Sequence, residues 1–360
     1  MNQMPLTILI PTLNRPSILA KALRYYASTG FSGTIAIGDS SRPEGMRENQ
    51  TLVREFGKDL QIDYHECPLL NDSSCLQHLI ATTKTTYAVF SGDDDLLVPK
   101  GLQRCVDFLN GHPDYSAAHG VAVQFVYPAL PEGEFRTGFY PQPVLEAETP
   151  GERLQALCQT YRVSLFSVHR IETWKQMYAH VTELTDRSFC EILPVCLSAV
   201  YGKIKQVDYL SLIRQHHEGR FALPDYYDWI SRPSWPQNQA VFSRRLAEHL
   251  IRQEKIDEEK AQAMVKKAFG THLSSQMTHQ LQRDYGIGPL PTKAKIKYAV
   301  KQNRILERLL PLWRSWQNPN PFSLEALLSP RSAHYEDFQP AFRVLAESKP
   351  TAKTSNTKDN

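Results

Sequence analysis

The sequence predicts an α/β protein: an open, mostly parallel sheet with helices on both faces, followed by a C-terminal helical region. Up to about residue 218, short apolar runs alternate with segments of helical periodicity. This alternation favours parallel strands joined by helices. Beyond Gly219 the pattern is typical of helices interrupted by prolines. A chain of 360 residues, 41% of them hydrophobic, can fill a sizeable core.

Strand and helix signals follow one another from the start of the chain. Residues 6–14 form an apolar run, and residues 15–29 repeat apolar side chains at helical spacing, with Pro16 near the first turn. Further strands are expected at residues 33–41, 60–67, 86–90, 116–127 and 203–217. Further helices are expected at residues 48–57, 73–83, 100–115, 150–161 and 186–202. Residues 128–143 are rich in Gly and Pro and predict a loop or hairpin.

These signals divide the chain into three parts. We expect a core domain at residues 1–220 and a helical region at residues 221–347. Residues 348–360 lack the apolar content to fold and are expected to be disordered.

Polar residues follow three of the predicted strands at their carboxyl ends, where open α/β sheets bind ligands. They lie at residues 12–15, 39–41 and 93–95. Adjacent carboxylates raise one another's pKa, so Asp93, Asp94 and Asp95 predict a positive counterpart. Mg²⁺ or Mn²⁺ bound with a phosphate would suit these oxygen ligands. The alternative is a solvated acidic turn that caps the helix near Pro99.

Three segments carry a resemblance to a known family. LTILIPTLNRPSILAKAL, IAIGDSS and SGDDDLLVP, in this order, resemble the GT-A fold of nucleotide-diphospho-sugar transferases, nearest to family 2 glycosyltransferases. The similarity continues through TDRSFCEILPVCLSAVYGKIKQVDYLSLIRQHH. It implies a metal-dependent enzyme that moves a sugar from a nucleotide-diphosphate sugar to an acceptor hydroxyl with inversion. Two positions depart from the family pattern: Ser40-Ser41 follow Asp39, and Gly92 stands where many relatives have a further Asp.

The resemblance also implies roles for single residues. The first nucleotide-contacting loop would consist of Pro11, Thr12, Asn14 and Arg15. Asp39 would accept a hydrogen bond from the base, and Asp93 would lie near the ribose with Asp94 beside it. The metal ligands would be Asp95 and Asp93, with His217 as an additional ligand.

Sugar transfer needs a base that takes the proton of the acceptor hydroxyl. Glu191 lies where the family's Glu-Asp motif places its catalytic acid, and Asp186 is the second candidate. About 140° separates them on a helix, so they need not share a face. Asp186 as a helix cap and Glu191 as a solvated side chain remain the alternatives. For Arg214, contact with a diphosphate and an ordinary surface ion pair both stay open.

Partners and location follow from charge and hydropathy. A formal charge of +3 gives no reason to expect nucleic acid, and the scattered cysteines fit reduced thiols. No signal peptide or membrane span is recognisable, so we expect a cytoplasmic protein. Basic and apolar residues interleave at 293–314, which predicts peripheral contact with an anionic membrane or an anionic acceptor. A solvated helix face is the alternative there.

The class suggests a glycan or lipid-linked acceptor of the cell envelope, in polysaccharide biosynthesis. Two other functions compete with this prediction. One is a non-catalytic nucleotide-sugar-binding or scaffold protein. The other is a nucleotidyltransferase, but the first loop, PTLNRPS, contains no glycine for the phosphate loop expected of that class.

Overall fold

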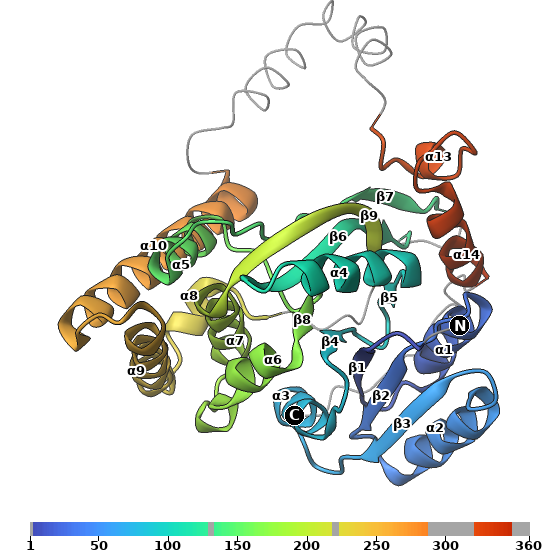
Figure 1. Cartoon of the computed structure of the whole chain (residues 1–360), viewed down its shortest axis with the longest axis horizontal. Helices are drawn as coiled ribbons and strands as arrows, with labels where there is room; N and C mark the ends of the chain where they lie inside the picture. Colours follow the sequence, from blue (N-terminus) through green and yellow to red (C-terminus); the bar gives the residue numbers. More distant parts are fainter. Residues whose placement is uncertain (1–2, 129–132, 218–222, 287–319, 348–360) are drawn as a thin grey trace, which may run out of the picture.

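The computed structural model describes residues 3–128, 133–217, 223–286 and 320–347 (Figure 1). In these ranges nine strands form one sheet, in the order β3-β2-β1-β4-β8-β6-β9-β5, and β7 pairs with β6. The strands are β1 (Leu6–Thr12), β2 (Thr34–Asp39), β3 (Gln61–Glu66), β4 (Tyr87–Phe90), β5 (Leu96–Leu97), β6 (Tyr115–Val126), β7 (Arg136–Phe139), β8 (Val168–Arg170) and β9 (Lys203–His216).

The longest ladders of the sheet are parallel. β3, β2, β1 and β4 pair in parallel, and so do β6 and β9. Short antiparallel strands complete the sheet: β8 links the two parallel groups, and β5 and β7 pair with β9 and β6. The predicted open, mostly parallel α/β sheet is therefore confirmed.

Helices cover both faces of the sheet. Leu6 and Ile8 of β1 lie in a core cluster with α1 and α4, whereas Leu9 lies in a second cluster with α3 and α7. This alternation follows from the two-residue period of a strand. The helices of this part are α1 (Pro16–Ser28), α2 (Pro43–Phe56), α3 (Asp72–Thr82), α4 (Pro99–Gly111), α5 (Pro150–Gln159), α6 (Ile171–Tyr178) and α7 (Arg187–Tyr201), with a 3₁₀ turn at Val181–Glu183.

Three local expectations need correction. Helix α2 begins at Pro43, five residues before the predicted start, because proline suits the first helical turn. The two-residue strand β5 was not predicted, since a run this short has no periodicity of its own. β8 was also missed, because its three residues lead directly into α6.

The C-terminal helices lie in two separate places (Figure 1). Helices α8 (Tyr226–Ile230), α9 (Trp235–Glu254) and α10 (Glu258–Tyr285) pack near α5 and α7. Helices α13 (Leu324–Leu327) and α14 (Tyr335–Ala346) return to the other end of the molecule, where α14 packs on α1. The predicted C-terminal helical region is confirmed, while the domain boundaries remain a prediction.

Two segments with predicted properties lie outside the described residues. They are the basic segment at 293–314 and the tail at 348–360. Within the described ranges, every helix is too short or too polar to span a bilayer. All six cysteines are free and buried.

A buried histidine in the helical region should make the stability of the fold depend on pH. His272 of α10 is 0% exposed, and burial lowers its pKa to about 4. The unfolded chain therefore binds a proton below about pH 6.5 that the folded chain rejects. Stability from this residue is complete above pH 6.5 and is lost as the pH falls toward 4.

We expect His272 to lower the free energy of unfolding by about 2 kcal/mol between pH 6.5 and 5. The measurement is urea unfolding across this pH range. His272→Gln removes the titration and should give a flatter pH dependence than the parent. Equal slopes for the two proteins would exclude His272 as the source.

Candidate functional site

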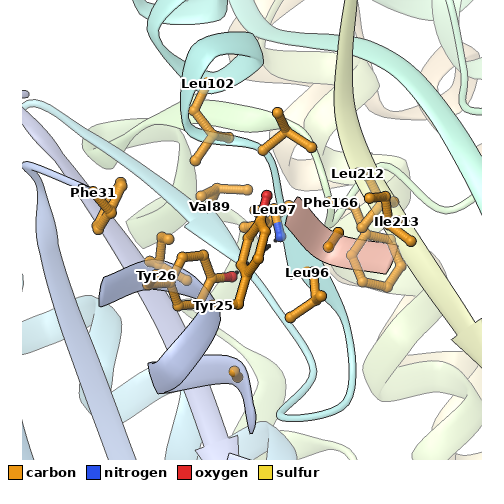
Figure 2. Packing of buried hydrophobic residues seen from close by; sticks show 14 of the residues in the cluster. Tyr25, Tyr26, Phe31, Val89, Leu96, Leu97, Leu102, Phe166, Leu212 and Ile213 are labelled. Carbon is orange, nitrogen blue, oxygen red and sulfur yellow. Dashed lines mark hydrogen bonds between the residues drawn. The ribbon is translucent and has the colours of Figure 1, made fainter. Parts of the chain in front are cut away.

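The acidic triplet lies in the turn between β4 and β5, and apolar packing holds both sides of this turn. Leu96 and Leu97 of β5 pair with Ile213 and Leu212 of β9. The backbone N–H of Leu97 also donates to the hydroxyl of Tyr26 on α1, at 3.2 Å. Figure 2 shows these side chains together in one apolar cluster. The fold thereby fixes the backbone that carries the three carboxylates.

Arg15 is the main positive counterpart of the triplet. Its guanidinium contacts Asp93 Oδ1 and lies 2.9 Å from Asp94 Oδ2. The hydroxyl of Thr12 donates to Asp93 Oδ2 at 2.8 Å. The end of β1 and the acidic turn are therefore joined through charged and polar side chains.

The end of β9 closes the other side of the triplet. The backbone N–H of Gln215 donates to Asp95 Oδ1 at 2.9 Å, and its side chain donates to the carbonyl of Asp94. His217 Nε2 lies 3.0 Å from Asp94 Oδ2. His217 thus lies beside the acidic residues, where the family resemblance places it; its metal role remains a prediction.

The three carboxyl groups titrate differently. Burial raises the pKa of Asp93 despite the nearby Arg15, and burial together with the charge of Asp94 raises the pKa of Asp95 to about 7. Burial opposes ionisation of Asp94 too, but His217 and Arg15 outweigh it and lower that pKa to about 2. Asp95 is only 5% exposed, so the solvated acidic turn that the sequence left open as an alternative does not describe it.

The first loop is fastened to the loop after β2. Asn14 has a φ of 54°, in the left-handed region, where Asn is more tolerated than most residues. Its N–H donates to Ser41 Oγ at 2.7 Å, and its Oδ1 accepts from the N–H of Arg42 at 2.8 Å. Pro11 lies in β1 opposite Gly38. Asn14 therefore sets the path of the backbone that leads to Arg15.

Asp39 is buried among its own neighbours at the end of β2. Its carboxylate accepts hydrogen bonds from the N–H of Ser41, the amide of Asn49 and the hydroxyl of Tyr64, at 2.7–2.8 Å. It is 0% exposed. The structure shows Asp39 as an organiser of the β2 end, and its contact with a base remains a prediction.

Glu191 lies on α7 and has the environment of a tuned acid. The hydroxyl of Tyr161 donates to Glu191 Oε1 at 3.3 Å. Desolvation raises the pKa of Glu191, and the charge of Arg214 opposes this rise. The side chain is only partly buried, so solvent reaches it. Raised proton affinity combined with access is what a general base requires.

Arg214 connects the two groups of acids. Its charge acts on the pKa of both Asp95 and Glu191. Its guanidinium donates to the hydroxyl of Tyr140 and stacks over the rings of Tyr140 and Phe166, at 4.9 and 4.5 Å from the centroids. Of its nitrogens, the buried Nε has no hydrogen-bond partner among the described residues. A surface ion pair does not describe this residue.

Sequence reasoning left three contributors unnamed: Tyr140, Tyr161 and Gln215. Only the position of Gln215 directly after Arg214 at a strand end could have indicated it. The two tyrosines come from loops whose course depends on tertiary packing.

Asp186 caps α7, the alternative that the sequence left open. Asp186 Oδ1 accepts from the N–H groups of Ser188 and Phe189 at 3.0 and 3.1 Å, and from the indole of Trp229 at 2.8 Å.

We expect Asp186→Ala to lower the free energy of unfolding by about 1–3 kcal/mol, because the N–H groups at the start of α7 and the buried indole of Trp229 lose their acceptor. Asp186→Asn, which keeps a cap oxygen, should be milder. Turnover per folded molecule should change little in either variant, and a large loss of turnover without unfolding would instead make Asp186 a catalytic residue.

The acidic turn fits a divalent cation in its donor chemistry. Asp94 Oδ1 and Asp95 Oδ2 accept no hydrogen bond from the described residues, and both border the space left by the missing Cβ of Gly92. A Cβ there would lie 2.6 Å from Asp94 Oδ1 and 3.2 Å from Asp95 Oδ2. No three His, Cys, Asp or Glu side chains of the described ranges converge as a complete metal site. Mg²⁺ is usually coordinated by one or two carboxylates together with phosphate oxygens of the substrate.

The three carboxylates of the turn differ in whether their oxygens are already engaged by other side chains. The oxygens of Asp93 are engaged by Thr12 and Arg15, so Asp94 and Asp95 offer the open positions.

A separate pocket lies at the amino ends of β1 and β2, lined by residues such as Thr7, Thr34 and Gln61. The acidic turn follows the carboxyl end of β4, so this pocket lies at the opposite ends of the strands.

Comparison with known proteins supports the fold. No family model matches the sequence, and no curated protein matches it. Among solved structures, S. aureus TarS 1-349 matches with a TM-score of 0.50 and 14% identity, over 78% of this chain and 75% of that chain. The same protein in complex with UDP-GlcNAc matches with a TM-score of 0.50 and 13% identity, over 78% and 76%.

At such low identity the likeness to TarS shows the fold alone. The mannosyltransferase PcManGT from Pyrobaculum calidifontis, in complex with GDP-Man and Mn²⁺, matches with a TM-score of 0.38 and 11% identity over 86% of this chain and 83% of that chain, a score too low to support a conclusion. The GT-A type of fold that the sequence motifs implied is confirmed.

Proposed function

We propose that this chain is a metal-dependent glycosyltransferase that transfers a sugar from a nucleotide-diphosphate sugar to an acceptor hydroxyl with inversion. One observation carries the proposal. The charge of Arg214 acts on both Asp95 of the acidic turn and the desolvated Glu191, so groups suited to a diphosphate and a group suited to an acceptor proton occur within electrostatic reach of one residue. The acidic turn and Arg214 lie at strand ends of a fold shared with TarS, which has been solved with UDP-GlcNAc.

The donor side consists of the acidic turn and the two arginines. Asp94 and Asp95 would hold Mn²⁺ or Mg²⁺, which when bound supplies Lewis-acid stabilisation of a leaving diphosphate. Arg15 and Arg214 add guanidinium donors, which match phosphate oxygens in geometry and charge. The unpartnered Nε of Arg214 offers one such donor at once.

On the acceptor side, Glu191 takes the hydroxyl proton. Tyr161 holds its Oε1, which fixes the direction in which the carboxylate faces. The positive charge of Arg214 opposes the rise in the pKa of Glu191 that burial causes, and so favours the ionised form. Attack by the deprotonating hydroxyl on the far side of the donor bond gives inversion at the anomeric carbon.

We propose a saccharide as the acceptor, either free or lipid-linked, in cell-envelope glycan synthesis. Tyr140, Tyr161 and Tyr226 are partly exposed, and each of their pKa values responds to the charge of Glu191. Three aromatic rings near the base provide apolar surface with polar tips, which suits a sugar ring. Work at the cytoplasmic face of an anionic membrane belongs to the same proposal.

A thermal-shift screen tests the donor side of the proposal. UDP-GlcNAc, UDP-glucose, GDP-mannose and their free nucleotides are compared with and without Mn²⁺. A ligand at 100 times its Kd adds about 2.7 kcal/mol of stability, so a true donor should raise the unfolding temperature by several degrees. No shift with any of these nucleotides in Mn²⁺ would count against the proposed function.

A further inference from the structure

Arg15 occupies the position of a cation in the acidic turn. One guanidinium nitrogen, Nη2, contacts both Asp93 Oδ1 and Asp94 Oδ2. The side chain of Arg15 is 28% exposed, while those of Asp93 and Asp94 are 8% and 14% exposed. In such partly desolvated surroundings the ion pairs are strong, and any incoming cation must compete with them.

The Arg15 guanidinium contacts the carboxylates through Nη2 and does not use its Nε donor. Arg15 Nε is buried and has no hydrogen-bond partner among the described residues. A buried unsatisfied N–H is unfavourable, so the carboxylate-bound position does not use all of the donors of the side chain. The backbone before it is fixed by Asn14, which leaves the side chain as the part that can move.

Charge balance decides what can displace Arg15. With all three carboxylates ionised and His217 neutral, the guanidiniums of Arg15 and Arg214 leave one excess negative charge, and protonation of His217 or of Asp95 would only reduce it. A divalent cation alone would turn this balance positive, and a nucleotide-sugar diphosphate alone, with about two negative charges, would make it strongly negative. When both ligands bind, the charges of the cation and the diphosphate cancel, so the net charge of the site stays the same.

We propose that Arg15 is a built-in counter-ion that keeps a divalent cation out of the acidic turn until a nucleotide diphosphate enters with it. This inference rests on the proposed function. Arg15 then leaves Asp94 for the diphosphate, whose oxygens accept its N–H donors, including Nε. Metal and nucleotide therefore bind with strong positive coupling, and Arg15 is the source of that coupling.

Binding of Mn²⁺ alone tests the inference. Free Mn²⁺ is measured by electron paramagnetic resonance at pH 8, with and without UDP and, in parallel, GDP. In the parent, nucleotide should tighten Mn²⁺ binding by roughly 5–150-fold, the usual range of coupling between ligands. In Arg15→Met, Mn²⁺ alone should bind about 10-fold more tightly or better, and the coupling should shrink. Arg47→Met is the matched control, because exposed Arg47 has its single ion pair within the described ranges with Glu44 of its own helix.

A second variant keeps the test decisive if Arg15→Met does not fold. Arg15→Lys retains a positive charge but lacks the planar guanidinium. Its Mn²⁺ affinity should therefore lie between that of the parent and that of a site with no positive side chain at position 15. If the variant that folds binds Mn²⁺ no better than the parent, the counter-ion role is wrong. If neither UDP nor GDP binds any protein at saturating Mn²⁺, the proposed function fails, while the comparison in Mn²⁺ alone still decides the role of Arg15.

Discussion

Glu191→Gln should lower turnover by roughly 10²–10⁴-fold, the usual contribution of general-base catalysis, while donor affinity is unchanged. Glutamine keeps the size of the side chain and an oxygen that can accept from Tyr161, but it cannot take a proton. Because the proposed diphosphate contacts belong to the acidic turn and Arg15, this change should leave them intact. The measurement combines single-turnover rates with nucleotide affinity by calorimetry.

Two comparisons sharpen this result. Desolvation raises the pKa of Glu191, so the parent rate should fall as the pH drops through a value above the ordinary glutamate range. The residual rate of Glu191→Gln should lack that acidic limb. Tyr161→Phe, which leaves the base in place but removes its hydrogen bond, should cause a smaller loss and move the limb. A variant that loses donor affinity in parallel with turnover would show that Glu191 is not acting as the base.

Gly92→Ala should weaken metal-dependent nucleotide binding by about 10–100-fold, the scale seen when the setting of metal ligands is disturbed. The φ of Gly92 is not in the left-handed region, so backbone freedom does not explain this glycine. Its missing Cβ instead leaves room for carboxylate oxygens: an added methyl would lie 2.6 Å from Asp94 Oδ1 and push that group aside. Asp94→Ala, which removes the ligand itself, should have an effect at least as large.

Gly270→Ala is the matched control for this experiment. Nothing lies within 4 Å of a Cβ added at Gly270, and the position is helical, so alanine is tolerated there. Mn²⁺-dependent binding of UDP or GDP is measured for all three variants, with circular dichroism as a check on folding. Parent-like affinity in both Gly92→Ala and Asp94→Ala would remove the metal from this turn.

The fold was predictable because its signals are local. A buried apolar run that ends in polar residues marks β1, β2 and β4, and the carboxyl ends of these strands necessarily meet at one edge of the sheet. The same reasoning placed residues 12–15, 39–41 and 93–95 near one another in advance, whereas the place of His217 at the end of β9 came from the family resemblance. Order along the chain was sufficient for this step.

The contacts within the site were not predictable in the same way. Arg15 meets Asp93 and Asp94 only because the two loops share the sheet edge, and no periodicity in either segment encodes that pairing. Asp186 was ambiguous for a similar reason, since its bond with Trp229 joins α7 to a helix far along the chain. The burial of Asp95 likewise depends on β9 closing over it.

The packing of α14 on α1 has a consequence for synthesis on the ribosome. Phe338, Ala341 and Leu345 fill the same cluster as Tyr25 and Tyr26 of α1, so the first-made helix is covered by one made near the end. Until α14 has emerged, the nascent amino-terminal half presents apolar surface to its surroundings, and such long-range closure slows folding. The chain should therefore depend on chaperone protection late in translation, and ribosome stalling before α14 should leave an aggregation-prone intermediate.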